Sequence, residues 1–167
     1  MPILGIGVTS RDYSRPPSKT KDTFWIEARP PYSDTRGDPQ LVGKWAVYVA
    51  LRRLDESWEK IRKSTIDSRL GFLSKSSTAK KNFAPNSISN RMITVYTHDY
   101  YDIDDVFRVG RELNDLGFGI DNPIYYESDD VMYAHRHVVK GDSNLSMYRC
   151  LKGRFWSRDE KNNWTEI

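Results

Sequence analysis

The sequence predicts an α+β fold in which a curved antiparallel β-sheet carries two main helices on one face. Three observations predict it. Two segments have the periodicity of amphipathic helices, strand-like runs lie before and after each of them, and the two strand–strand–helix units follow one another as a pseudo-repeat. The opposite, concave face of such a sheet stays free for a ligand.

The first helix is predicted over residues 55–69. Its apolar positions recur at helical spacing and share one face, while charged side chains fall on the other: the apolar face holds Leu54, Trp58, Ile61 and Thr65. This pattern is typical of a helix that packs one side against a sheet.

The second helix has the clearest start and stop signals in the chain. Asp102 stands at the N-cap position, with Asp105 three residues later as its capping-box partner. Gly117 is the predicted stop, because glycine is the usual residue just past a helix end. The buried stripe between them consists of Val106, Val109, Leu113 and Leu116.

Strands are expected on both sides of each helix. The strand-like runs cover residues 24–26, 44–49, 71–75, 92–97, 123–126, 131–139 and 148–156, and a long loop is expected over 76–91. The first twenty-one residues lack a sustained apolar pattern and are expected to form an extended arm, so that residues 22–167 make a single α+β domain.

The composition excludes several classes of protein. The chain has 167 residues, 38% of them hydrophobic, with a mean hydropathy of −0.71, which describes a globular domain with a charged exterior. No apolar run approaches the length of a membrane span, and no signal-peptide pattern begins the chain. Cys150 is the one cysteine, so an internal disulfide or cysteine-based zinc site is excluded and a reducing, cytoplasmic compartment is expected, in a cell or a virus-infected cell.

The net charge of +3 is too small to require nucleic acid as a partner. Its distribution is uneven, since basic residues outnumber acidic ones over 52–81 and the reverse holds over 99–130. Two interpretations remain open: ordinary solvated helix faces, or a basic focus for an anionic ligand beside an acidic flank that discourages long polyanions.

The strongest candidate for a binding site is the segment 75–81. Lys75, Lys80 and Lys81 supply positive charge for a phosphate, while Ser77 and Thr78 supply hydroxyl groups. The glycines of a Walker loop are absent. The alternative interpretation is a solvated loop rich in serine and lysine.

Aromatic side chains offer a second candidate, because an aromatic face can hold a base by stacking. Trp58 lies on the apolar stripe of the first helix and is expected in the core. Trp45 and Trp25 are the more open candidates, although core packing is the alternative for both. Arg91, at the end of the long loop, is included among the ligand contacts.

His135 and His137 fall on the same face of a predicted strand. Such a pair can bind a metal or share acid–base work, but no third ligand stands at a suitable spacing, so no metal is predicted. We count both as candidate ligand contacts. No catalytic residue and no cofactor are assigned, because the sequence holds no complete catalytic constellation.

Five segments together resemble the basophilic-leukaemia-expressed protein family. They are Gly-Lys-Trp at 43–45, 54–61, 70–80, Val-Tyr-Thr-His-Asp at 95–99, and 104–109, and the match runs from Trp25 to Tyr126. The resemblance implies a fold similar to that of the cap-binding translation initiation factor, whose concave sheet grips a nucleotide with tryptophans and basic side chains. Microbial members of the family carry the label of a phosphothreonine lyase domain.

The chain departs from the family pattern after the second helix. Members tend to show a Tyr-Lys pair there, whereas this chain has Tyr125, Tyr126 and Glu127. The expected function is therefore the binding of a phosphorylated, nucleotide-like small molecule in a basic and aromatic cleft, for sensing or sequestration. One alternative is a phosphate-eliminating lyase in which a lysine abstracts a proton and His135 or His137 assists. Another is a protein–protein scaffold.

Overall fold

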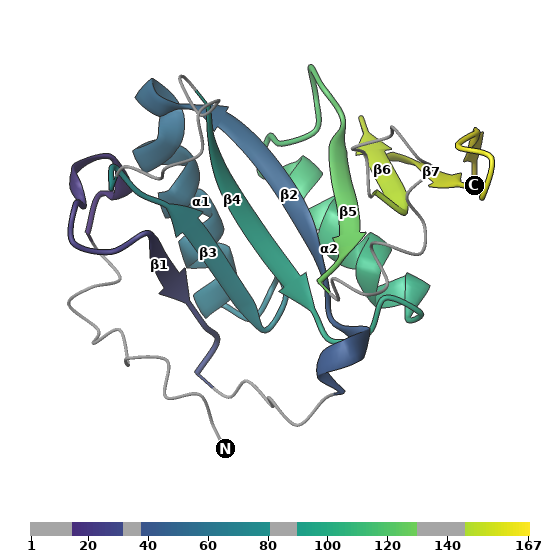
Figure 1. Ribbon diagram of the computed structural model, residues 1–167, viewed down its shortest axis with the longest axis horizontal. Coiled ribbons are helices and arrows are strands. Elements are labelled where there is room, and N and C mark those ends of the chain that lie inside the picture. Colours follow the sequence, from purple (N-terminus) through teal and green to yellow (C-terminus); the bar gives the residue numbers. More distant parts are fainter. Residues whose placement is uncertain (1–14, 32–37, 81–89, 130–145) are drawn as a thin grey trace.

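The computed structural model describes residues 15–31, 38–80, 90–129 and 146–167. Eight strands form one antiparallel sheet in the order β1-β3-β4-β2-β5-β6-β7-β8 (Figure 1). The strands are β1 Trp25–Ala28, β2 Gly43–Ala50, β3 Leu73–Ser77, β4 Asn90–Thr97, β5 Ile124–Ser128, β6 Tyr148–Leu151, β7 Arg154–Arg158 and β8 Trp164–Glu166.

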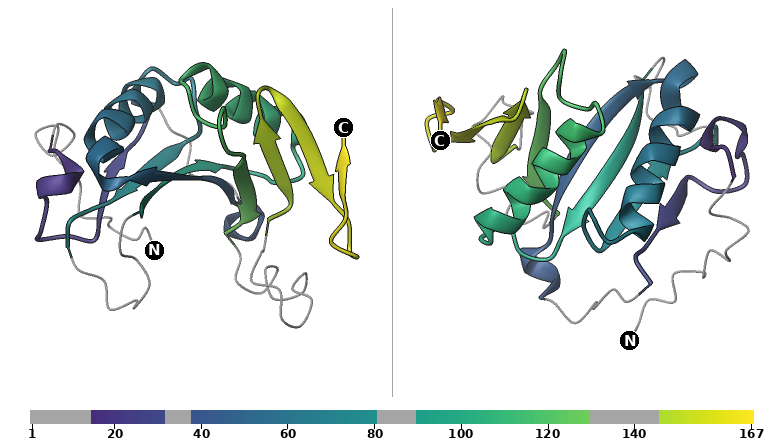
Figure 2. Two further views of the ribbon diagram at one scale, coloured as in Figure 1. Left: turned by 90° about the horizontal axis from the view of Figure 1, so that it is seen from above. Right: turned by 180° about the vertical axis from the view of Figure 1, so that it is seen from behind.

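Two helices cover one face of the sheet, which arches away from them (Figure 2). They are α1, Leu54–Ile66, and α2, Ile103–Asp115, and each follows a pair of strands in the chain. Short 3-10 turns at Pro17–Lys19, Pro39–Leu41 and Leu51–Arg53 join the elements. The predicted α+β class, with a curved antiparallel sheet and both helices on one face, is confirmed.

The start and stop signals of α2 act as predicted. The Asp102 carboxylate accepts a hydrogen bond of 3.2 Å from the backbone N–H of Asp105. Gly117 has a φ of +99°, the left-handed conformation that ends a helix at little cost for glycine. The first helix ends at Ile66, short of the predicted residue 69, since Ser68 already has a φ of +60°.

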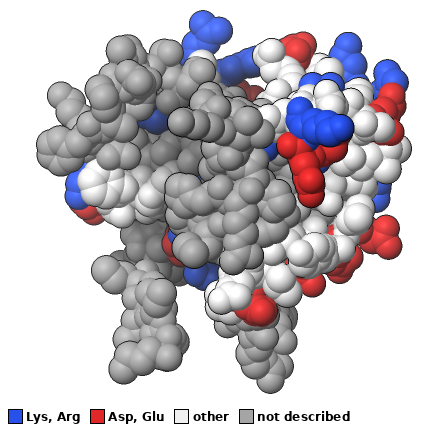
Figure 3. All heavy atoms as spheres, turned by 45° about the vertical axis from the view of Figure 1, so that its right-hand side comes forward, with Lys and Arg blue, Asp and Glu red and all other residues white. Residues whose placement is uncertain are grey.

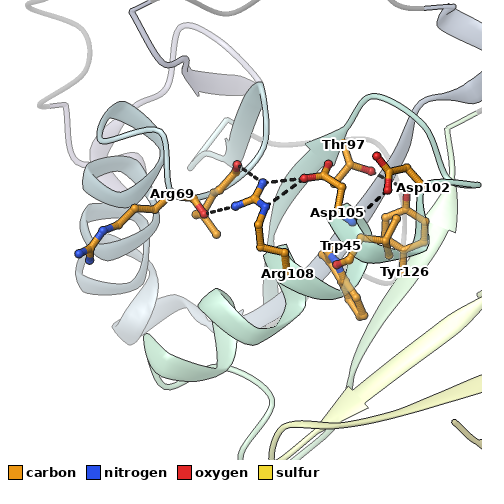
Figure 4. Close-up of polar contacts among 9 residues, drawn as sticks. Trp45, Arg69, Thr97, Asp102, Asp105, Arg108 and Tyr126 are labelled. Atoms are coloured by element: carbon orange, nitrogen blue, oxygen red, sulfur yellow. Dashed lines mark hydrogen bonds and ion pairs between the residues drawn. The ribbon is translucent and has the colours of Figure 1, made fainter.

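The core lies between the helices and the sheet. The predicted stripe of α1 is buried throughout, Trp58 included, and so are the residues of α2 that face the sheet. Most buried polar groups on this side have a hydrogen-bond partner in the protein. The Trp45 indole donates to the Val106 carbonyl at 2.9 Å, and the hydroxyls of Thr97 and Tyr126 lie 2.6 Å apart (Figure 4). Burying these groups therefore costs little.

One arginine of α2 forms hydrogen bonds with the segment that follows α1. Arg108 of α2 donates to the carbonyl oxygens of Arg69 and Leu70, at 2.8 and 3.1 Å, in the segment that follows α1 (Figure 4). Its guanidinium also bonds to the Asp105 carboxylate at 2.8 Å. These contacts hold the end of the first helical unit against the side of the second.

The C-terminal strands differ from the prediction. The single strand expected over 148–156 is a hairpin of β6 and β7, because Lys152 and Gly153 have φ values of +51° and +74° and form a tight two-residue turn. The strand β8 was not predicted. The strand expected over 131–139 lies outside the described residues.

The described part of the predicted arm packs against the domain. Pro17 is buried, the Ser18 N–H donates to the Asp55 carboxylate at 2.9 Å, and the Pro17 carbonyl accepts from Ala79 at 3.0 Å. Residues 15–20 are thus held between the start of α1 and the end of β3. Among the described helices, none combines the length and the apolar character needed to cross a membrane.

Candidate ligand-binding face of the sheet

One row of paired residues crosses all eight strands. In strand order it contains Glu27, Lys75, Thr94, Ala46, Tyr125, Arg149, Trp156 and Glu166. Side chains alternate between faces along a strand, and the flanking Trp45, Ile93 and Val95 belong to the core under the helices. The row therefore faces the opposite, concave side of the sheet seen in Figure 2.

Small side chains occupy the middle of this row. Ala46 and Thr94 lie side by side on β2 and β4, and Thr94 is only 1% exposed. The Thr94 hydroxyl has no hydrogen-bond partner among the described residues. A buried polar group without a partner is uncommon in native proteins and calls for an explanation.

Lys44 lies beside this centre with its charge matched by carboxylates. Its ammonium is 2.7 Å from Asp129 and 3.9 Å from Glu127, and it lies 5.8 Å from the centroid of the Tyr96 ring. Burial works to lower the pKa of Lys44, but the hydrogen bond and ion pair with Asp129 outweigh it and raise the pKa above its usual value. Burial also raises the pKa of the Glu127 carboxyl.

Lys75 is arranged in the same way on the other side of Tyr96. Its ammonium lies 3.6 Å from Glu27 and 5.4 Å from the Tyr96 ring centroid. Outside the grey atoms, Figure 3 shows one basic group directly beside an acidic one near the middle of the surface. The lysines of the concave face are therefore already neutralised by nearby acids.

The far end of the face carries a different arrangement, which we name the arginine–tryptophan cluster. It consists of Tyr125, Arg149, Arg154, Trp156, Arg158 and Trp164. The guanidinium carbon of Arg149 lies 4.8 Å from the Trp156 ring and 4.9 Å from the Trp164 ring. Arg154 lies 5.5 Å from the Trp156 ring and is paired with Glu166 at 2.5 Å. Among the described residues, Arg149 contacts no carboxylate.

The predicted segment 75–81 is only partly free for a ligand. Ser77 lies in β3, not in a loop, and its hydroxyl accepts a 2.9 Å hydrogen bond from the Met92 N–H. Thr78 is buried and its hydroxyl donates to the carbonyl of Thr23. The Lys80 ammonium lies 4.4 Å from the centroid of the Phe24 ring.

The aromatic and arginine candidates fall on different faces. Trp25 is 37% exposed and shares the concave side with its partner Ser77. Trp45 is fully buried against α2, so its interpretation as an open stacking residue is wrong; its strand is apolar on both faces, which hid the direction of the side chain. Arg91 lies on the side of β4 that also carries Ile93 and therefore points away from the concave face.

Three candidates, Lys81, His135 and His137, lie outside the described residues. Within the described ranges, no group of acidic, histidine or cysteine side chains is arranged to hold a metal ion. Cys150 is buried, and burial raises the pKa of its thiol to about 11, so it is a poor nucleophile at neutral pH.

The arginine–tryptophan cluster was missed by the sequence analysis. One signal for it was present: Arg154, Trp156 and Arg158 alternate along one short strand and so share one face. The contribution of Arg149 and Trp164 was not visible, because it depends on which strands become neighbours.

The chain belongs to the family of basophilic leukemia-expressed protein Bles03, whose family model matches residues 39–135. The family resemblance read from the sequence is thereby confirmed. No curated protein matches the chain in sequence.

The chain is also similar to solved structures of eIF4E. For Ascaris suum eIF4E-3 with m2,2,7G cap the identity is 19% and the TM-score 0.44, over 56% of this chain and 55% of that one. For schistosome eIF4E complexed with m7GpppG and 4E-BP the values are 15% and 0.48, over 67% and 61%. The chain thus spans less than two thirds of the length of these proteins. At TM-scores of 0.44 and 0.48, the similarity does not show that this chain binds the same ligands.

Proposed function

We propose that this chain binds a phosphorylated, nucleotide-like small molecule on the concave face of its sheet, for sensing or sequestration. The observation that carries the proposal is the position of Arg149, whose guanidinium carbon lies 4.8 and 4.9 Å from the centroids of two indole rings and, in the described part of the chain, near no carboxylate. It combines positive charge with aromatic surface, the two properties that such a ligand requires.

The surroundings of Arg149 suit the recognition of a phosphate. Cation–π contact with the two rings restrains the guanidinium, and a guanidinium in such contact keeps its N–H groups as hydrogen-bond donors. Such a fork matches two oxygens of a phosphate group at once. Because little freedom remains to be lost on binding, more of the interaction energy becomes affinity.

The lysine end of the face is less well prepared for an anion. The ion pairs of Lys75 with Glu27 and of Lys44 with Asp129 must break before either lysine can pair with a phosphate. We therefore propose Lys75, Lys80 and Ser77 as secondary contacts. Trp25 offers an exposed ring beside them.

The alternative function, a phosphate-eliminating lyase, requires a base and an acid placed together at one bond. The histidines proposed for that role, His135 and His137, lie outside the described residues. No contact among the described side chains favours elimination over binding, so binding is the function we propose.

Calorimetric titration of the full chain tests the proposal. The probes are nucleoside triphosphates, m7GpppG and inorganic tripolyphosphate. Arg149→Met is expected to weaken binding of a nucleoside triphosphate at least tenfold, about 1.4 kcal/mol, because it removes the donors and keeps the stem that packs on the rings.

Arg111→Met is the matched control. Arg111 also lies over an aromatic ring, Phe155 at 5.8 Å, but on the helix-covered side of the sheet. Its replacement should leave affinity unchanged. The proposal fails if the parent chain binds none of these phosphates, or if both variants bind as the parent does.

A further inference from the structure

The Thr94 hydroxyl lies in the centre of the concave face and has no role in the proposed function. It is almost completely buried, it faces away from the helices, and it has no hydrogen-bond partner among the described residues. Folding gains nothing from a hydroxyl at such a position, because a methyl group would fit without the desolvation cost. A ligand that bonds to it would account for its presence.

We propose that Thr94 hydrogen-bonds an uncharged polar group in the nucleoside part of the ligand while Arg149 holds its phosphate. This inference rests on the proposed function and adds an orientation to it. The ligand would lie along the row that crosses the strands, above Ala46 and Tyr125.

The charges around Thr94 favour an uncharged group there. Lys44 and Lys75 stand on either side of Tyr96, and the carboxylates of Glu27, Glu127 and Asp129 lie close to their ammonium groups. An anion at Thr94 would meet these acids as well as the lysines and gain little. A neutral donor or acceptor, such as a base edge or a sugar hydroxyl, meets no such opposition.

The spacing of the strands sets the size of the ligand. Thr94 and Arg149 are three strand intervals apart, from β4 through β2 and β5 to β6, which is roughly 14 Å at the usual distance between strands. One phosphate ion cannot contact both residues. A ligand that does so must carry its polar group and its phosphate on one elongated molecule, as a nucleoside di- or triphosphate does.

Because Thr94 is almost completely buried, a ligand reaches its hydroxyl only if neighbouring side chains move. Lys44 and Lys75 have long, flexible stems, and their ion pairs are partly exposed to solvent. Pairs of this kind contribute little to stability, so displacing them costs little.

The first arm of the test measures the stability of the free chain. Thr94→Val keeps the shape of the side chain and removes only the hydroxyl, so the Tm should stay the same or rise. Thr65→Val is the matched control, since the Thr65 hydroxyl bonds to the Ile61 carbonyl and to Ser74, both at 2.7 Å. The control should lower the Tm by about 2–4 °C or more.

The second arm measures affinity by calorimetry with two probes, a nucleoside triphosphate and inorganic tripolyphosphate. Thr94→Val should weaken binding of the nucleoside triphosphate about three- to tenfold, the usual effect of one hydrogen bond. It should leave tripolyphosphate unaffected. Arg149→Met should weaken both probes.

The outcomes separate this inference from the proposed function. Equal loss of both probes in Thr94→Val, or no loss of either, overturns the role of Thr94 while Arg149 still supports phosphate binding. A Thr94→Val chain that is clearly less stable than its parent also overturns it, since the hydroxyl would then serve the fold. If Arg149→Met changes neither probe, the proposed function itself fails.

Discussion

The polar groups on the two faces of the sheet differ in their hydrogen-bond partners. Under the helices, Trp45, Thr97 and Tyr126 bond to protein atoms in a closed core. On the concave face, Thr94 lacks a partner in the described structure and Arg149 is held by aromatic rings alone. The first face is arranged for stability, whereas the second retains hydrogen-bonding capacity that folding does not use.

An unpaired group alone does not mark a ligand site. The Trp58 indole N–H is also buried without a partner among the described residues, yet it belongs to the helix-covered core. Thr94 differs by its position in a row that also carries Lys75 and Arg149. The comparison therefore separates residues whose polar groups serve the fold from residues whose hydrogen-bonding capacity the fold leaves unused, and substitutions on each face can test it.

The largest effect is expected from the helix-covered face. Leu113 is fully buried on α2, so Leu113→Ala should lower the free energy of unfolding by about 2–5 kcal/mol through lost burial and a residual cavity. Urea unfolding measures this change. Because Leu113 lies behind the sheet, affinity for a nucleoside triphosphate below the melting temperature should hardly change, and a large loss of affinity would show that the faces are not independent.

A smaller effect is expected at the lysine end of the concave face. Replacing Lys75 and Lys80 together by Ala should weaken phosphate binding about two- to threefold, roughly 0.5 kcal/mol, because Lys75 is already paired with Glu27; little stability should be lost. Titration with tripolyphosphate measures it. Unchanged affinity would remove this end of the face from the site.

The cap of α2 should contribute less than its buried stripe. Asp102→Ala removes the acceptor of the Asp105 N–H and should cost about 0.5–2 kcal/mol. Asp102→Asn keeps a capping oxygen and serves as the control, with most of the stability retained. Thermal unfolding of both variants measures the difference, and equal losses would mean that the carboxylate charge, rather than the cap, is what matters.

The fold was predictable because its main signals are local. Asp102 and Gly117 mark the ends of a helix within a few residues, and the apolar stripes give the face that packs. The C-terminal hairpin was missed because Lys152 has a left-handed conformation, which a lysine rarely adopts. The long strand prediction ran straight through that turn.

The candidate face was less predictable because it depends on contacts between strands. Arg149 meets Trp164 only after β6, β7 and β8 have paired, and no spacing in the sequence encodes that meeting. For Trp45 the sequence left stacking and core packing open, because apolar residues occur on both faces of its strand. Lys75 was found from its charge, but its pairing with Glu27 needed the register of β1 and β3.

The smallest predicted effect is the change in Tm with pH when Glu127 or Glu166 is replaced, and its sign should differ between the two residues. Burial raises the pKa of Glu127 on the concave face, so its charged form is disfavoured in the folded chain. The stability of the folded state is therefore greatest while Glu127 is protonated and falls as pH rises through its raised pKa. Glu127→Gln removes this penalty and should raise the Tm slightly at pH 7, and the gain should vanish below the ordinary glutamate pKa of about 4.3.

Glu166 provides the matched control with the opposite sign. Its hydrogen bonds to Arg154 lower the pKa of its carboxyl, so its contribution to stability is present above the ordinary pKa and is lost as pH falls through the lowered one. Glu166→Gln should therefore lower the Tm slightly at pH 7 and have no effect in acid. Thermal unfolding of both variants from pH 3 to pH 8 measures the two trends. If Glu127→Gln also lowers the Tm at pH 7, the ion pair with Lys44 outweighs the burial of the Glu127 carboxylate.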